Sequence, residues 1–250
     1  MNDDNKYTNM QKKFYNHAYA AWSLDNPRYI VGDFDRLDNW DELNNTMMEF
    51  IGDTENKIAL DFACGPGRNL VLFKDKFKRI DGVDISSQSL EHARSYCNHC
   101  GDNSEHQLFF CDGVSLSCIE NDKYDAIITV NALHHICVHD IRFNYFKEFY
   151  RVLKPGGKIS LTMAYGKPNV LEFSTDYYNN FYDAERTNSG MDVRTENPSQ
   201  LKDDLDKIGY VNFKYKIISN LPPSPLDKNK QWTIDHRFPF MIVFSAEVDK

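Results

Sequence analysis

The sequence predicts an α/β fold in which a doubly wound, mostly parallel sheet is covered by helices on both faces. Short strand-like runs alternate with helical patterns between residues 57 and 163, and this alternation is typical of such a sheet. Residues 124–130 (YDAIITV) are almost continuously apolar, which fits a strand buried on both faces. The chain has 250 residues, 41% of them hydrophobic and 26% charged, so it can form one large domain with its own core.

Five strands are predicted in the alternating part, at residues 57–63, 79–84, 107–111, 124–130 and 158–163. Apolar residues at helical spacing predict a helix after the first, second and fourth of them. The second helix is expected to begin with Ser86 or Ser87 as its N-cap, and the third with Asp140. The Lys154-Pro-Gly-Gly157 turn should end the third helix, because proline lacks an N–H donor and glycine turns readily.

The C-terminal part predicts one more helix, opened by Pro198 and Ser199 and ended by Gly209. Strands at 211–219 and 240–248 follow and are expected to be antiparallel at one edge of the sheet. We therefore expect a single domain with four parts: an N-terminal helical cap (1–50), a cofactor-binding core (51–163), an inserted lid (164–197) and a C-terminal helix with edge strands (198–250).

Charge and hydropathy exclude several classes of partner. The formal net charge is −8, and no basic run is present to replace counterions on phosphates, so a polymeric nucleic acid is disfavoured. No stretch approaches the ~18 apolar residues of a spanning helix, and residues 1–13 lack the apolar segment of a signal peptide. We therefore expect a cytoplasmic protein without membrane contact, whose six cysteines are thiols. The sequence carries no signal for an oligomeric state.

The strongest functional signal is the turn Asp61-Phe-Ala-Cys-Gly-Pro-Gly67 between the first strand and its helix. Its glycines let the backbone approach a ligand closely, and the helix N-terminus that follows offers unpaired N–H groups. A ligand bound there lies at the carboxyl end of the sheet, where the strand order reverses. A dinucleotide fingerprint needs a third glycine where this chain has Leu70, and no Gly-Lys-Ser/Thr follows for a P-loop. A tight turn that binds nothing is the remaining alternative.

Aspartates follow the next two strands. Asp84 is placed to accept both hydroxyls of a ribose, although an acidic residue at a strand end can also simply cap the next helix. Asp112 can accept from an exocyclic amine while Gly113 exposes its N–H to a ring nitrogen, so the pair would hold an adenine edge. An ordinary Asp-Gly turn is the alternative for this pair.

In this order and spacing, the segments DFACGPG, GVDIS, FCDGVSL, YDAIITVNALHHI and RVLKPGGKI resemble the class I S-adenosylmethionine-dependent methyltransferases over residues 57–163. The RVLKPGG segment resembles the branch that modifies small molecules. The resemblance implies a Rossmann-like methyltransferase fold, with a seven-stranded sheet whose last strand is antiparallel. It also implies S-adenosylmethionine as cofactor, S-adenosylhomocysteine as product, and transfer of a methyl group to an oxygen or nitrogen of a small-molecule substrate.

The resemblance further implies a role for each cofactor residue. The methionine part would contact Asp61 and the loop residues Ala63, Cys64, Gly65 and Gly67. Asp84 would bind the ribose, Ile85 would pack against adenine, Asp112 and Gly113 would hold its edge, and the backbone near Asn131 would lie by the sulfonium. A non-catalytic S-adenosylmethionine-binding protein is the main alternative, and a nucleotide-binding oxidoreductase the weaker one.

Two histidines, His134 and His135, follow the fourth strand and are the candidate catalytic residues. Histidine titrates near neutrality, so either one is a candidate to accept a proton from the methyl acceptor. The alternative is that they cap the following helix or orient the loop. The loop lacks the D/N-P-P-Y/F pattern of related enzymes that act on amide or base nitrogens, which disfavours those acceptors.

Aromatic residues near the N-terminus form a candidate lid. Tyr15, Tyr19 and Trp22 lie at helical spacing and would shield the sulfonium, with cation–π attraction; a helix packed on the flank of the sheet is the alternative. Arg28, with Arg186 and Arg194, is a candidate to bind an acidic substrate group, and a solvated surface arginine is the alternative for each.

A metal site is not expected from the sequence. The segment Cys97-Asn-His99-Cys100 has ligand spacing, and His92 and His106 are near it in the sequence. A structural zinc site needs a second pair of ligands at a suitable distance, and Cys111 and Cys118 do not form one.

Overall fold

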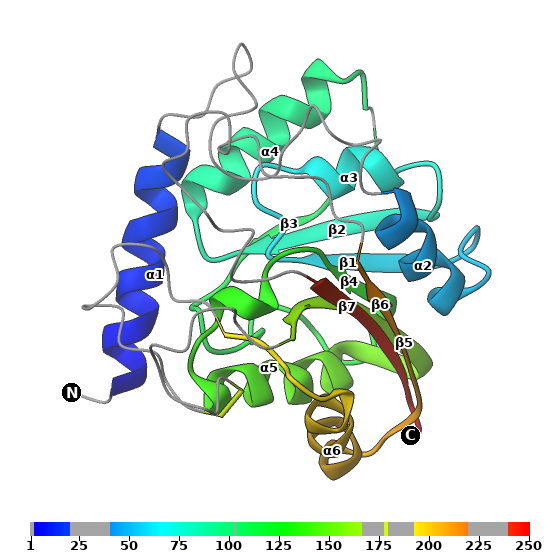
Figure 1. The fold of residues 1–250 in the computed structure, drawn as a ribbon. Coiled ribbons are helices and arrows are strands. Elements are labelled where there is room, and N and C mark those ends of the chain that lie inside the picture. The colour runs from blue at the N-terminus through cyan, green and yellow to red at the C-terminus, as the bar shows by residue number, and fades with distance from the viewer. Residues whose placement is uncertain (1–2, 21–40, 103, 167–177, 180–192, 220–239) are drawn as a thin grey trace.

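A computed structural model describes residues 3–20, 41–102, 104–166, 178–179, 193–219 and 240–250 of the chain. Its centre is a seven-stranded sheet in the order β3-β2-β1-β4-β5-β7-β6, with helices on both sides (Figure 1). The order runs outward in both directions from the pair β1 and β4, so the sheet is doubly wound as the sequence predicts.

The first five strands are parallel to one another, namely β1 (Ile58–Phe62), β2 (Arg79–Asp84), β3 (Leu108–Phe110), β4 (Tyr124–Thr129) and β5 (Leu153–Tyr165). The last strand, β7 (Phe240–Val248), lies between β5 and β6 (Tyr210–Ile218) and is antiparallel to both. The expected antiparallel last strand of a seven-stranded sheet is therefore confirmed.

Helices cover the two faces in separate groups. In the described ranges the helices are α1 (Asp3–Ala20), α2 (Asp41–Ile51), α3 (Arg68–Phe73), α4 (Ser87–His99), α5 (His139–Val152) and α6 (Pro198–Ile208), with the 3₁₀ turn η2 (Leu133–His135). Helices α2, α3 and α4 share one buried apolar cluster, and α5 and α6 share the other. Among the described residues, no helix has both the length and the apolar character needed to cross a membrane.

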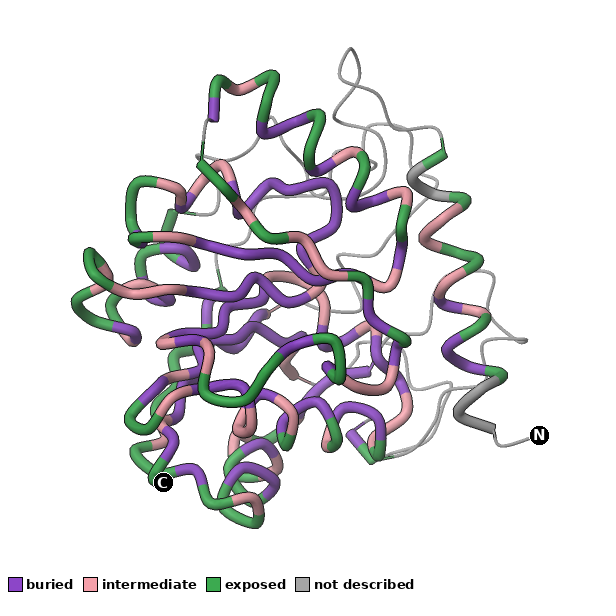
Figure 2. The backbone as a smooth tube through the Cα atoms, turned by 180° about the vertical axis from the view of Figure 1, so that it is seen from behind, coloured by how far each residue is buried: buried purple, intermediate pink, exposed green. Residues whose placement is uncertain are grey.

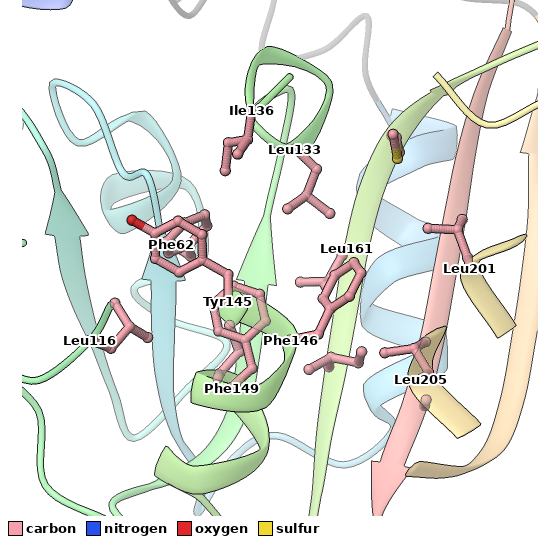
Figure 3. Close-up of a cluster of buried hydrophobic side chains, with 14 of the residues drawn as sticks. Phe62, Leu116, Leu133, Ile136, Tyr145, Phe146, Phe149, Leu161, Leu201 and Leu205 are labelled. Atoms are coloured by element: carbon pink, nitrogen blue, oxygen red, sulfur yellow. The ribbon is translucent and has the colours of Figure 1, made fainter. Parts of the chain in front are cut away.

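Alternation along the strands explains how one sheet supplies two cores. On β1, Ala59 belongs to the cluster under α2 to α4, while Leu60 and Phe62 belong to the cluster under α5 and α6. Strands β1, β2, β4, β5 and β7 are buried along most of their length, whereas the outer strands β3 and β6 are largely not (Figure 2). In Figure 3, Tyr145 and Phe149 of α5 face Phe62, with ring centroids 4.6 and 4.9 Å from it. These contacts fix α5 over the middle of the sheet.

One predicted helix start was wrong, and one strand begins earlier than predicted. Asp140 does not cap α5: the N-cap is Val138, and Asp140 lies exposed in the first turn, where its charge complements the helix dipole. Helix α5 ends at Val152, just before the Lys154-Pro-Gly-Gly157 segment as predicted, but β5 already begins at Leu153. The pairing with β4 shifts register there, so a bulge accommodates the proline that cannot donate to the ladder.

The predicted start of α4 and both predicted ends of α6 are confirmed. Ser86 is the N-cap of α4 and its hydroxyl accepts from the Ser89 amide at 3.1 Å. Helix α6 starts at Pro198 and is followed by Gly209 in the left-handed conformation (φ 112°). All six cysteines are free of disulfide bonds, as expected.

Candidate cofactor and acceptor site

The carboxyl ends of β1, β2, β3 and β4 lie side by side, and this row of strand ends is the edge of the sheet at which the cofactor is expected (the cofactor edge). Register pairs Phe62 with Val83 and Asp84 with Phe110, so the ends of the first three strands coincide. Strands β1 and β4 are neighbours, but β1 leads to β2 in one direction along the sheet and β4 leads to β5 in the other. The connections that follow β1 and β4 therefore diverge, and a crevice lies between them. The structure thus brings the three motifs that follow β1, β2 and β3 to one place, as the sequence predicts.

Asp84 ties the glycine turn to the second strand. Its Oδ2 accepts from the Gly65 amide at 2.9 Å, and its Oδ1 accepts from the Ser86 amide at 2.8 Å. A carboxylate offers about four lone-pair sites, so acceptor capacity is left on both oxygens for the hydroxyls of a ligand. Burial raises the pKa of Asp84 to about 6, although the amides of Ser86 and Gly65 act against the rise.

Gly67 sets the start of α3. It is the N-cap residue, with φ 91°, and a Cβ at this position would lie 3.1 Å from the Cα of Ala93 on α4. Only glycine allows both the backbone conformation and the close approach of α4. The requirement for glycine here is therefore structural as well as functional.

Asp61, the last but one residue of β1, is fully buried. Its Oδ1 accepts from the side-chain amide of Asn69 at 3.1 Å, while its Oδ2 is buried and accepts no hydrogen bond from any described residue. Burial raises the pKa of Asp61 to about 7, against the opposing effects of Asn69 and Arg68. A buried carboxylate oxygen without a donor is destabilising by about 1–3 kcal/mol or more, so this oxygen indicates a donor that a ligand supplies.

Ala63 and Cys64, the two residues directly before Gly65, differ in what they can present to a ligand. Ala63 takes the left-handed conformation with φ 56°, which is strained for a residue with a Cβ. The Cys64 side chain is buried against β2, since a Cβ on Gly82 would lie 2.7 Å from its Sγ, and burial raises the pKa of this thiol well above its usual value. Cys64 can therefore present only its backbone to a ligand.

The pair after β3 forms a closed Asp-Gly turn. Asp112 Oδ1 accepts from the amides of Val114 and Ser115 at 2.8 and 2.7 Å. Burial acts to raise the pKa of Asp112, but these donors outweigh it and hold the pKa below the usual value. Gly113 has φ 96°, and a Cβ on it would lie 2.6 Å from Cδ1 of Ile85, so the two residues expected around adenine are in contact. Their contact with adenine stays a prediction.

The loop after β4 carries the two candidate catalytic histidines on η2. His134 is buried and His135 half-buried, with their ring centroids 4.1 Å apart. Asn131 begins the loop in the left-handed conformation (φ 58°), and its amide donates to the Thr162 hydroxyl at 2.9 Å. The His134 carbonyl accepts from the Val193 amide at 2.8 Å, so the inserted segment borders this loop. Both roles of the histidines, proton acceptor or support of the loop, stay predictions.

Helix α1 lies across this edge of the sheet rather than on its flank. The Tyr7 hydroxyl donates to the His135 carbonyl at 2.5 Å and accepts from the Cys137 amide at 2.7 Å, and the Gln11 side chain also donates to the His135 carbonyl. Farther along the helix, Asn16 Oδ1 accepts from the Ser86 hydroxyl at 2.6 Å. The helix thus bridges the loops after β4 and β2, and Figure 1 shows it alongside the strand ends.

The predicted lid residues can be located in part. The Tyr15 ring meets His135 edge-on, with centroids 6.4 Å apart, so it lies by the candidate catalytic loop. The Tyr19 side chain, Trp22, Arg28 and Arg186 lie outside the described residues. Arg194 is buried, so the solvated alternative is wrong for it.

Tyr7 and Gln11 were not among the sequence candidates. With Tyr15 they recur every fourth residue and so share one face of α1. That spacing is the signal that would have found them.

The fold is a doubly wound α/β domain, and the motifs that follow β1, β2 and β3 meet at the carboxyl ends of its strands. Residues 59–157 match the family described as a methyltransferase domain. These residues, about two fifths of the chain, are therefore similar to a methyltransferase domain.

Similar proteins differ in the acceptors that their names state. The chain is 27% identical over 155 residues to the sterol 24-C-methyltransferase of Candida albicans, covering 60% of this chain and 39% of that protein. It is 31% identical over 104 residues to the probable tRNA methyltransferase 9B of Homo sapiens, covering 42% of this chain and 20% of that protein. The chain thus spans well under half the length of these relatives.

A solved structure of similar fold is phosphoethanolamine N-methyltransferase 2 of Haemonchus contortus, in complex with phosphomonomethylethanolamine and S-adenosylhomocysteine. Its TM-score is 0.62 at 16% identity, and the match covers 91% of this chain and 59% of that chain. At this identity the likeness shows the fold alone.

Proposed function

We propose that this protein transfers the methyl group of S-adenosylmethionine to an oxygen or nitrogen of a small molecule. The observation that carries the proposal is the buried Oδ2 of Asp61, which accepts no hydrogen bond from the described residues. Asp61 lies on β1, next to β2, and the Gly65 amide that follows β1 donates to Asp84 at the end of β2. The ammonium of the methionine part is the donor that this oxygen fits.

Each residue of the edge has a task in this proposal. Asp61 holds the ammonium, Asp84 holds the ribose hydroxyls, and Ile85 with Gly113 borders the adenine. When bound, the cofactor supplies a methyl group that is already electrophilic because it is attached to a sulfonium. The chain has mainly to align the acceptor with this methyl group and to exclude water, and such alignment is worth about 7–11 kcal/mol.

His135 is the better placed of the two histidines for proton transfer. It is half-buried, its backbone carbonyl is held by Tyr7 and Gln11, and its ring meets Tyr15. A base in this position removes a proton from an acceptor hydroxyl or ammonium, with a typical contribution of about 10²–10⁴-fold in rate.

Two features favour a small acceptor over a tRNA. Helix α1 crosses the strand ends and contacts the loops after β2 and β4, so it limits access to the edge where the methyl group would lie. The net charge of −8 opposes binding to a polyphosphate backbone. The chain aligns with the probable tRNA methyltransferase over 104 residues and with the sterol methyltransferase over 155 residues. Because these two relatives are named for different acceptors, similarity to them does not indicate which acceptor this chain uses.

Calorimetric titration with S-adenosylhomocysteine tests the cofactor assignment. We expect binding by the wild type and strongly weakened binding by Asp84→Ala, with Asp75→Ala on the exposed surface as the matched control. No heat and no thermal shift with this ligand would refute the assignment, and binding of NAD(P) in its place would support an oxidoreductase.

Release of S-adenosylhomocysteine tests the acceptor class. Parallel assays use a panel of small amines and alcohols, bulk tRNA, and sterol-containing vesicles. Turnover with a member of the panel supports the proposal, and turnover with tRNA or sterol alone overturns its acceptor class. Binding without any transfer would indicate a non-catalytic S-adenosylmethionine-binding protein. His135→Ala should reduce turnover and spare binding, whereas exposed His99→Ala should change neither.

A further inference from the structure

A second cluster of ligand-type side chains lies between the end of α4 and the start of β3. Cys97 comes from the last turn of α4, Asp102 from the loop that follows, and His106 from just before β3. One ligand atom from each lies within 4.8 Å of the others. Cys97 and Asp102 are buried, and the His106 side chain is only 5% exposed. The sequence suggested Cys97 with Cys100, but the structure groups Cys97 with two residues that follow α4.

Hydrogen bonds fix the ring of His106 between β2 and Asp102. Its Nδ1 lies 2.5 Å from the Ile80 carbonyl, which can only accept, so Nδ1 carries a proton. Its Nε2 lies 2.8 Å from Oδ2 of Asp102. Nε2 and this oxygen therefore lie next to each other, and both lie within 4.8 Å of the Cys97 sulfur. A ring nitrogen that donates to a backbone carbonyl is also the usual support of a metal-binding histidine.

The loop presents Asp102 as a fixed carboxylate. Its backbone amide donates to the Cys97 carbonyl at 2.9 Å, and its Oδ1 accepts from the Ser104 amide at 2.9 Å. Burial acts to raise the pKa of Asp102, but the bonds from Ser104 and His106 outweigh it and lower the pKa below the usual value. Oδ2 is therefore ionised near neutral pH and held toward Nε2.

Cys97 completes the set with a sulfur atom. Burial raises the pKa of this thiol to about 12, so it is protonated unless a cation displaces the proton. A cavity of about 240 Å³ borders the cluster and is also lined by Arg94, Ser104 and Glu105. The cavity gives a metal ion a route from solvent and room for a water ligand.

We propose that Cys97, Asp102 and His106 bind a divalent cation of the zinc type. Thiolate, imidazole and carboxylate together are the donors of Zn²⁺ and of its substitute Co²⁺, whereas Mg²⁺ and Ca²⁺ take oxygen ligands. Binding releases the thiol proton, so affinity rises with pH. The ion would join the end of α4 to the starts of β2 and β3, at the edge opposite the cofactor site, and its role is structural.

Cobalt spectroscopy on the chelator-treated, dialysed full chain tests the proposal. We expect one equivalent of Co²⁺ to produce a thiolate charge-transfer band, and Zn²⁺ to abolish it. Zn²⁺ at a hundredfold excess over its Kd should raise the Tm by about 5–10 °C. Cys97→Ser should lose the band, while exposed Cys118→Ser should keep it. Binding of S-adenosylhomocysteine should be the same in both variants, which separates this proposal from the proposed function.

A measurement on the wild type keeps the test valid if Cys97→Ser fails to fold. Alkylation mapped by peptide mass should show that Zn²⁺ protects Cys97 and leaves the labelling of Cys118 unchanged. No cobalt band and no protection in the wild type would overturn the proposal and leave His106 and Asp102 as an ion pair. A band that persists in Cys97→Ser would overturn it as well.

Discussion

Removal of one hydroxyl tests whether α1 is held across the cofactor edge. Tyr7 is buried, and its hydroxyl donates to the His135 carbonyl at 2.5 Å and accepts from the Cys137 amide at 2.7 Å. Tyr7→Phe keeps the ring and deletes both bonds. The His135 carbonyl keeps Gln11 as a donor, so the loss falls mainly on the buried Cys137 amide. A lost bond of about 1 kcal/mol and an unsatisfied amide of about 1–2 kcal/mol together weaken docking of α1 by about 2–3 kcal/mol.

Hydrogen exchange measures this loss directly. At about 1.4 kcal/mol per factor of ten, the amides of α1 should exchange about 30- to 150-fold faster in Tyr7→Phe. Turnover should fall because the His135 turn loses its support, while the Kd for S-adenosylhomocysteine should change little. Tyr215→Phe on the exposed face of β6 is the matched control and should leave exchange in α1 unchanged. Unchanged α1 exchange in Tyr7→Phe would refute the reasoning.

Three further predictions concern the cofactor edge. Asp84→Ala should weaken S-adenosylhomocysteine by about 10- to 100-fold in calorimetry, because it deletes charged acceptors for the ribose; full affinity would contradict the ribose role. Ala63→Gly should raise the free energy of unfolding in urea by about 0.5–1 kcal/mol, because relief of left-handed strain exceeds the added freedom of the unfolded chain; a loss of stability would contradict this. Burial raises the pKa of Asp61 to about 7, well above the ~4 of an unfolded aspartate. Between about pH 4 and pH 7 the folded chain therefore binds more protons than the unfolded chain, and its stability falls as the pH rises through this range. The Tm of the ligand-free protein should therefore fall from about pH 5 to about pH 7.5, and Asp61→Asn should fall less; an equal fall in both would count against this assignment.

Local patterns predicted the parts of the fold that depend on neighbours in the sequence. Apolar periodicity located the strands, and capping chemistry identified the start of α4 and both ends of α6. Where a local rule failed, the tertiary structure supplied a competing interaction. A strand is predicted only after Pro155-Gly156-Gly157, yet Leu153 before this segment already pairs with Tyr124 of β4, so β5 begins earlier and a register shift spans the segment.

The sequence by itself determined the cofactor edge, because parallel strands end together and the motifs after β1, β2 and β3 must meet there. Only the tertiary structure decided what lies over that edge. The bonds from Tyr7 and Gln11 to His135 join residues 128 and 124 positions apart, and no short-range pattern encodes such a pairing. The same holds for the Cys97, Asp102 and His106 cluster, since the loop after α4 and the Ile80 carbonyl of β2 bring its ligand atoms together. Spacing along the chain fixes which residues share a face, whereas packing of distant elements fixes which faces meet.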